Sequence, residues 1–113
     1  MMSSAIKVLA AGVLVAAWAS PAAAQDPKVA KGEALFTAQK CTLCHAVGDK
    51  GNKKHPLDGM GKTLTADVVK MWLKDPKAAA AKFSKTGMPP MKSFATLPAE
   101  DVDALVAYVL SLK

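Results

Sequence analysis

The residues best suited to chemistry in this 113-residue chain lie in one pentapeptide, Cys41-Thr42-Leu43-Cys44-His45. Its pattern, C-x-x-C-H, is the attachment signature of c-type haem. Two thiols at this spacing can each add to one vinyl group of the same porphyrin and so form two thioether bonds. The adjacent His45 would then face the iron from the proximal side. We therefore predict one haem c, bound covalently through Cys41 and Cys44, with His45 as an iron ligand.

Three other interpretations of the two cysteines are weaker. A redox-active dithiol of the thioredoxin type needs a strand–helix–strand context, and no strand-rich segment precedes Cys41. A zinc site needs further Cys or His ligands, and outside the pentapeptide the sequence offers only His55. A disulfide between Cys41 and Cys44 would close a loop too short to stabilise the fold much.

Composition and charge exclude several classes of protein. Hydrophobic residues make up 51% of the chain and charged residues 21%, which excludes a disordered, highly charged chain. An aromatic content of 5% is low for a small all-β domain. All 15 basic residues are lysine, and the absence of arginine argues against base recognition by guanidinium groups. We therefore expect no nucleic-acid partner.

The N-terminal segment has the pattern of a secretory signal. Lys7 precedes an uninterrupted apolar stretch over residues 8–19, and residues 20–24 are small residues and proline, as at a signal cleavage site. We predict a signal peptide over 1–24, a mature domain over 25–113 and export to the bacterial periplasm. The apolar stretch is too short for a transmembrane helix, which needs about 20 residues, so no stable membrane span should remain after signal removal. An uncleaved amphipathic anchor is the weaker alternative, because no polar residue interrupts the stretch.

Helical periodicity dominates the rest of the chain. We predict helices from about Pro27 to Gln39 and from about Thr65 to Asp75, with Pro76 stopping the second. A third is predicted near the C-terminus with Pro98 in its first turn, because apolar residues recur there at helical spacing: Val102, Leu105, Val106, Val109 and Leu110.

The segment 46–64 contains four glycines and Pro56 and is predicted to be a long irregular loop. A loop of this length is unusual in a small domain unless it wraps around something. The predicted haem would provide that central group.

These features together resemble the small, soluble class I cytochromes c, over nearly all of the chain after residue 24. The C-x-x-C-H motif follows the first helix, as in that family. The first and last helices carry residues similar to the family's contact pairs, Gly32 and Phe36 against Leu105 and Tyr108, and Trp72-Leu73-Lys74-Asp75-Pro76 is similar to the end of the family's middle helix. The resemblance implies an all-α, cytochrome c-like fold of three to five short helices around one haem. The N- and C-terminal helices should cross, and Trp72 should contact the haem.

The resemblance also implies the groups around the iron. Pro56 falls where the family has a proline whose carbonyl accepts a hydrogen bond from the ring N–H of the axial histidine, here His45. His55 is expected to be a surface residue. Met60 and Met71 do not lie where the family places its ligand methionine.

The sixth ligand is expected between the last two helices, where both Met88 and Met91 are candidates. Met88 begins a Met-Pro dipeptide that is common in bacterial relatives. Met91 stands at the family's usual distance from Tyr108 and begins an M-x-x-F-x-x-L pattern, so we favour Met91. The sequence departs from that pattern at Lys92, where relatives carry proline.

A haem with both axial positions filled offers no site for a substrate or for oxygen, and the chain shows no nucleophile–base arrangement. We therefore expect a one-electron carrier rather than an enzyme, moving electrons from a dehydrogenase to an acceptor such as an oxidase, either free or as the haem subunit of a periplasmic dehydrogenase. The alternative is a gas-binding or peroxidatic haem protein with an open sixth site.

Six lysines fall in loops that should flank the haem edge: Lys50, Lys53, Lys54, Lys62, Lys85 and Lys92. Such a basic collar would attract a redox partner with an acidic docking patch. A lysine-rich surface without a preferred partner is the alternative.

Overall fold

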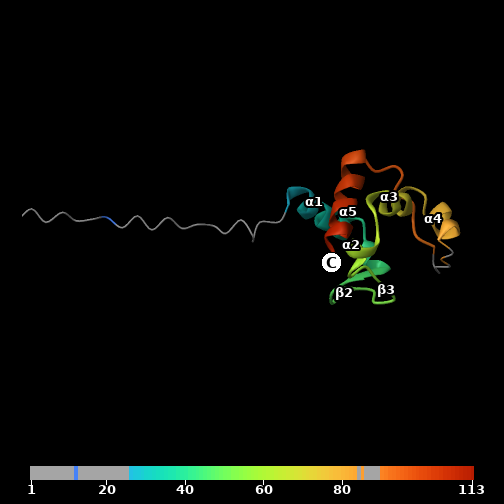
Figure 1. Cartoon of the computed structure of the whole chain (residues 1–113), viewed down its shortest axis with the longest axis horizontal. Helices are drawn as coiled ribbons and strands as arrows, with labels where there is room; N and C mark the ends of the chain where they lie inside the picture. The colour runs from blue at the N-terminus through green and yellow to red at the C-terminus, as the bar shows by residue number, and fades with distance from the viewer. Residues whose placement is uncertain (1–11, 13–25, 84, 86–89) are drawn as a thin grey trace, which may run out of the picture.

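The computed structural model describes residue 12, residues 26–83, residue 85 and residues 90–113 (Figure 1). Apart from residue 12, the predicted signal peptide 1–24 lies outside the described residues, and so does Met88. The described chain forms five α-helices and one short 3-10 helix: α1 (Pro27–Ala38), η2 (Cys41–Leu43), α2 (Met60–Thr63), α3 (Ala66–Lys74), α4 (Pro76–Lys82) and α5 (Ala99–Ser111). The predicted helical fold is confirmed.

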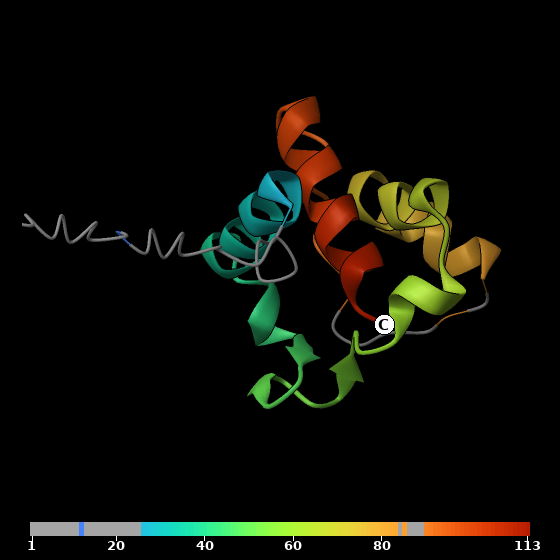
Figure 2. The same cartoon turned by 60° about the vertical axis from the view of Figure 1, so that its left-hand side comes forward.

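The terminal helices α1 and α5 pack against each other and cross (Figure 2). Gly32 allows the close approach, because a Cβ atom on it would lie 2.7 Å from the Cβ of Tyr108 and even closer to the carbonyl oxygen of Ala104. Beside this contact the rings of Phe36 and Tyr108 meet edge to face, with centroids 5.4 Å apart. The predicted crossing and its pairing of Gly32 and Phe36 with the last helix are confirmed.

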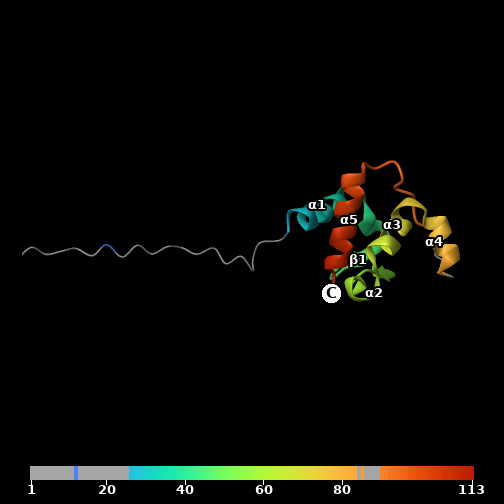
Figure 3. The same ribbon diagram turned by 45° about the horizontal axis from the view of Figure 1, so that its top comes forward.

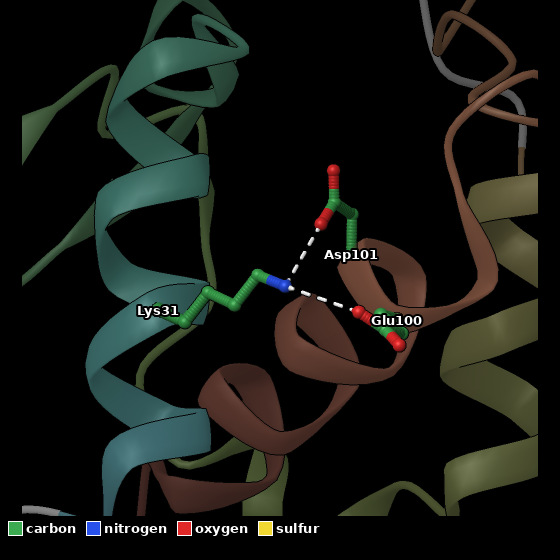
Figure 4. A network of polar contacts seen from close by, with 3 residues as sticks. All are labelled: Lys31, Glu100 and Asp101. Atoms are coloured by element: carbon green, nitrogen blue, oxygen red, sulfur yellow. Dashed lines mark ion pairs between the residues drawn. The ribbon is translucent and has the colours of Figure 1, made fainter.

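An ion-pair network bridges the outer edge of the same crossing (Figure 4). Lys31 of α1 lies 3.1 Å from the carboxylate of Asp101 and 4.0 Å from that of Glu100, both in the first turn of α5. The two carboxylates also complement the positive end of the α5 dipole. Because Lys31 and Glu100 are largely exposed to solvent, the network adds little stability compared with the buried crossing.

Helices α3 and α4 lie on the opposite side of α5 from α1 (Figures 1 and 3). Helix α3 begins where the Thr65 hydroxyl accepts the N–H of Val68, and it ends at Lys74. Asp75 then caps α4 by accepting the N–H of Ala78, and Pro76 occupies the first turn. Pro76 was predicted to stop the middle helix; the structure shows that it also starts the next one, because proline fits the first turn of a helix, where its missing N–H costs no bond.

The segment 46–64 is more ordered than predicted and adds a small sheet to the mostly helical fold. It holds β2 (Lys50–Gly51), β3 (His55–Pro56) and most of β1 (His45–Val47), which form a small sheet in the order β2-β1-β3. Strand β1 pairs antiparallel with β2 and parallel with β3. Helix α2 follows and joins the C-terminus, where the Gly61 N–H donates to the carbonyl of Leu112 at 2.7 Å.

The hydrophobic core lies mainly between α1, α3 and α5. Its buried members come from these helices and from the segment before α5: Phe36, Val69, Leu73, Phe94, Val102, Leu105, Val106, Tyr108 and Val109. Among the described residues, no helix is both long and apolar enough to cross a membrane.

Candidate haem site

A cavity of about 1620 Å³ opens against this core. The six residues predicted for the site all line it: Cys41, Cys44, His45, Pro56, Trp72 and Met91. They come from separate parts of the chain, namely η2 and the residue after it, β1, β3, α3 and the segment before α5. Most of the remaining wall is apolar and includes core residues such as Phe36, Leu73 and Leu105. A large apolar cavity bordered by two thiols and an imidazole fits a porphyrin attached through C-x-x-C-H.

The two cysteines are presented by a tight turn after α1. Lys40 adopts a left-handed conformation with φ 59°, which redirects the chain from α1 into η2. Within the turn the Cys44 N–H donates to the carbonyl of Cys41 at 3.2 Å. Both cysteines are free and half-buried. Burial raises the pKa of the Cys41 thiol to about 11, so this side chain is a neutral thiol at physiological pH.

Asn52 holds this turn from outside the motif. Its backbone N–H donates to the carbonyl of Thr42 at 3.0 Å, and its side-chain amide donates to the carbonyl of Leu43 at 3.1 Å. Its side-chain oxygen in turn accepts the N–H of Lys54 at 3.0 Å. Asn52 therefore fixes the two residues that separate the haem-binding cysteines. Sequence reasoning missed Asn52, because no local pattern links an asparagine to a turn nine residues away.

His45 is oriented by a backbone carbonyl. Its ring Nδ1 lies 3.0 Å from the carbonyl oxygen of His55. Because a carbonyl can only accept, Nδ1 carries the proton and Nε2 keeps its lone pair for a metal. Burial lowers the pKa of His45, with the His55 carbonyl acting in the opposite direction, and so favours the neutral ring that iron binding requires.

The prediction that the Pro56 carbonyl accepts this bond is wrong by one residue. In the parallel pairing of β1 with β3, His45 lies opposite His55 and Ala46 opposite Pro56. The Leu57 N–H donates to the carbonyl of Ala46. Carbonyls of successive residues in an extended strand point to opposite sides. The carbonyl of His55 therefore faces β1, whereas that of Pro56 does not. Pro56 keeps a place in the cavity wall, and His55 is exposed, as predicted.

Strand β2 packs against the backbone of His45 through Gly51. Gly51 has φ 95°, and a Cβ atom on it would lie 3.2 Å from the Cα of Ala46 and closer still to the carbonyl oxygen of His45. Only glycine combines this dihedral with this approach at no steric cost. His45 is thus supported by β2 on one edge and by β3 on the other.

The other side of the cavity is formed by α3, α4 and the segment before α5. Trp72 is half-buried and stacks on Phe83, with ring centroids 6.3 Å apart. Met91 is half-buried and packs against the core cluster. Met60, which was not predicted to be a ligand, also lines the cavity. Met71 is not among the lining residues.

Six lysines are among the residues that line the cavity. Those that line it are Lys40, Lys54, Lys74, Lys77, Lys85 and Lys92, with Asp75 as an acidic neighbour. Of the six lysines predicted near the haem edge, Lys54, Lys85 and Lys92 are therefore correctly placed. Lys50 instead lines a smaller hollow on another part of the surface, and neither Lys53 nor Lys62 borders the cavity.

The fold and the cavity define a c-type haem protein. The sequence model of the cytochrome c family, described as "Cytochrome c", matches residues 29–113, and the chain belongs to this family. It is a haem-based electron-transfer protein whose haem c is attached covalently at the Cys41–His45 motif. Members of the family are generally electron carriers rather than enzymes and are typically extracytoplasmic. No match was found among curated proteins or among solved structures.

Proposed function

We propose that this protein is a periplasmic one-electron carrier in which His45 and Met91 are the two iron ligands. The observation that carries the proposal is that Met91 and the Cys41–His45 motif, which are distant in the sequence, border one largely apolar cavity. When bound, the haem supplies a one-electron iron couple, and a thioether ligand raises its potential. We further propose that residues 1–24 are a signal peptide that directs export.

The chain's own residues would hold this centre and seal it. His45 is held in the required tautomer by the His55 carbonyl, and Trp72 with the apolar wall would exclude water from the bound haem. If His45 and Met91 both bind the iron, no site would be left there for a substrate. We therefore propose a carrier without an enzymatic activity of its own, acting either as a free shuttle between a dehydrogenase and an acceptor such as an oxidase, or as the haem subunit of a dehydrogenase.

Replacing Met91 by alanine is expected to remove the weak near-red absorption band of methionine-ligated ferric haem. The reduction potential should fall by roughly 0.1 V or more, because axial ligands set haem potentials over a range of about 0.8 V. The measurements are the visible spectrum of the oxidised protein and a potentiometric titration. Met60→Ala is the matched control, because it shortens another methionine of the same wall, and it should keep the band.

Two outcomes would contradict parts of this proposal. A band that survives in Met91→Ala would transfer the ligand role to Met88. If the unmodified protein lacks the band and binds carbon monoxide readily at neutral pH, the sixth site is open. The carrier function would then give way to the gas-binding or peroxidatic alternative.

The lysines that line the cavity support the proposal that the redox partner has an acidic docking patch. Opposite charges accelerate encounter, and salt screens the attraction between charges further apart than a Debye length, which is about 8 Å at physiological ionic strength. The rate of reaction with an anionic iron complex should therefore fall several-fold as salt rises, while the rate with a cationic complex should rise. Lys92→Glu should slow the anionic reaction at low salt several-fold, whereas Lys28→Glu, on the exposed part of α1, should change it little. Rates that do not depend on salt would exclude electrostatic steering.

A further inference from the structure

The chain that follows Met91 is tied to the C-terminal end of α3 by two hydrogen bonds. The Ser93 hydroxyl donates to the carbonyl of Lys74 at 2.8 Å, and the Phe94 N–H donates to the carbonyl of Leu73 at 2.7 Å. Carbonyls in the last turn of a helix have no partner within the helix. The segment 93–94 therefore satisfies two groups that α3 leaves free, and the two parts of the chain are held as one unit.

The Ser93 hydroxyl is fixed from both sides. Besides donating to Lys74, its oxygen accepts the N–H of Ala95 at 3.2 Å. The next residue, Phe94, is 7% exposed and anchors the segment in the core. Ser93 itself is exposed, so its hydroxyl can be removed without opening a cavity in the core.

The two ends of this connection carry two cavity-lining residues. Met91 lies two residues before Ser93, and Trp72 lies two residues before Lys74. Two extended residues span at most about 7 Å, so a fixed Ser93 limits how far Met91 can move from the wall. Without the bond from Ser93 to Lys74, the first fixed residue after Met91 would be the buried Phe94.

We propose that Ser93 is a positioning residue for the sixth iron ligand: its bond to Lys74 holds Met91 at the cavity and so keeps other ligands from the iron. The proposal rests on ligation by Met91, as proposed above. It concerns the equilibrium between attached and detached Met91, because an added ligand can bind only to the detached form. The apparent affinity of the added ligand is then its intrinsic affinity multiplied by the fraction of molecules in which Met91 is detached.

Titration of the oxidised holoprotein with imidazole tests the proposal. Ser93→Ala should raise the apparent affinity for imidazole about fivefold, the change expected when one hydrogen bond of ordinary strength is lost. Ser93→Thr keeps a hydroxyl and should restore the affinity of the unmodified protein. Ser111→Ala is the matched control, because Ser111 also donates its hydroxyl to a carbonyl near a helix C-terminus, that of Tyr108 in α5. It should leave imidazole binding unchanged.

The outcomes separate this proposal from the ligand assignment. If the methionine band is absent from the unmodified protein or survives in Met91→Ala, ligation by Met91 and the role of Ser93 are both overturned. If Met91→Ala abolishes the band but Ser93→Ala leaves the imidazole affinity unchanged, only the role of Ser93 is overturned. An equal rise in affinity for Ser93→Ala and Ser111→Ala also overturns it, because the effect would then reflect general loss of stability.

Discussion

Cys41→Ser/Cys44→Ser is expected to produce a protein that carries no covalently bound haem and unfolds without a cooperative transition. Serine hydroxyls do not add to the porphyrin vinyl groups, so any haem that enters the cavity can be extracted. Small domains are stable by only about 5–15 kcal/mol. Here the walls of a cavity of about 1620 Å³ include core residues such as Phe36 and Leu105. Without the haem these side chains lose their packing partner.

Two measurements check this double variant. Extraction with an acidified organic solvent should remove all haem from it and none from the unmodified protein, and circular dichroism should show no sharp thermal transition. Thr42→Ser is the control, because it changes the same turn but keeps both thiols. Haem that resists extraction from the double variant would show that the attachment does not depend on these cysteines.

Gly32→Ala is expected to destabilise the protein by about 3 kcal/mol, even though alanine favours helices over glycine by about 1 kcal/mol. A Cβ atom at this position would meet the carbonyl of Ala104, which belongs to the backbone of α5 and cannot rotate away. The helices would have to separate, and the Phe36–Tyr108 contact beside them would loosen. For a domain of this size the change corresponds to a fall in Tm of roughly 10–20 °C.

Thermal unfolding of the holoprotein measures this effect, and Ala34→Gly provides the contrast. Ala34 is exposed on the same helix, so its replacement should cost only the helix propensity of about 1 kcal/mol. If Gly32→Ala instead raised the Tm, propensity would outweigh the contact, and α1 and α5 would not cross as closely as described.

The long helices were predictable from local signals. The predicted helix over 27–39 is observed as α1 (Pro27–Ala38), and that over 65–75 as α3 (Ala66–Lys74). Both begin at a capping side chain, Asp26 and Thr65, that accepts a backbone N–H of the first turn. Helix α4 was missed, although Asp75 as a cap, Pro76 in the first turn and the following alanines were available as signals.

The small sheet could not be predicted, because its strands have two or three residues and show no periodicity. The same limit explains the error at Pro56. Which carbonyl accepts the bond from His45 depends on the register of β1 against β3, and a shift of one residue would turn the carbonyl of Pro56 instead of that of His55 toward β1.

The attachment motif was visible because its chemistry is local to five residues. Asn52 and Ser93 were not, because their bonds join residues 9 or 10 and 19 positions apart. Such contacts arise from tertiary packing and leave no local pattern. The sequence therefore indicated the attachment motif, whereas the structure was needed to find the residues that hold the cavity-lining groups in place.

The mass of the purified, denatured protein tests covalent attachment of haem at Cys41 and Cys44 most directly. We expect the mass of the chain from residue 25 onwards plus that of one haem, with the haem retained on the peptide that contains residues 41–45 after proteolysis. A mass equal to that of the polypeptide alone would contradict covalent haem attachment and, with it, the assignment of the cavity.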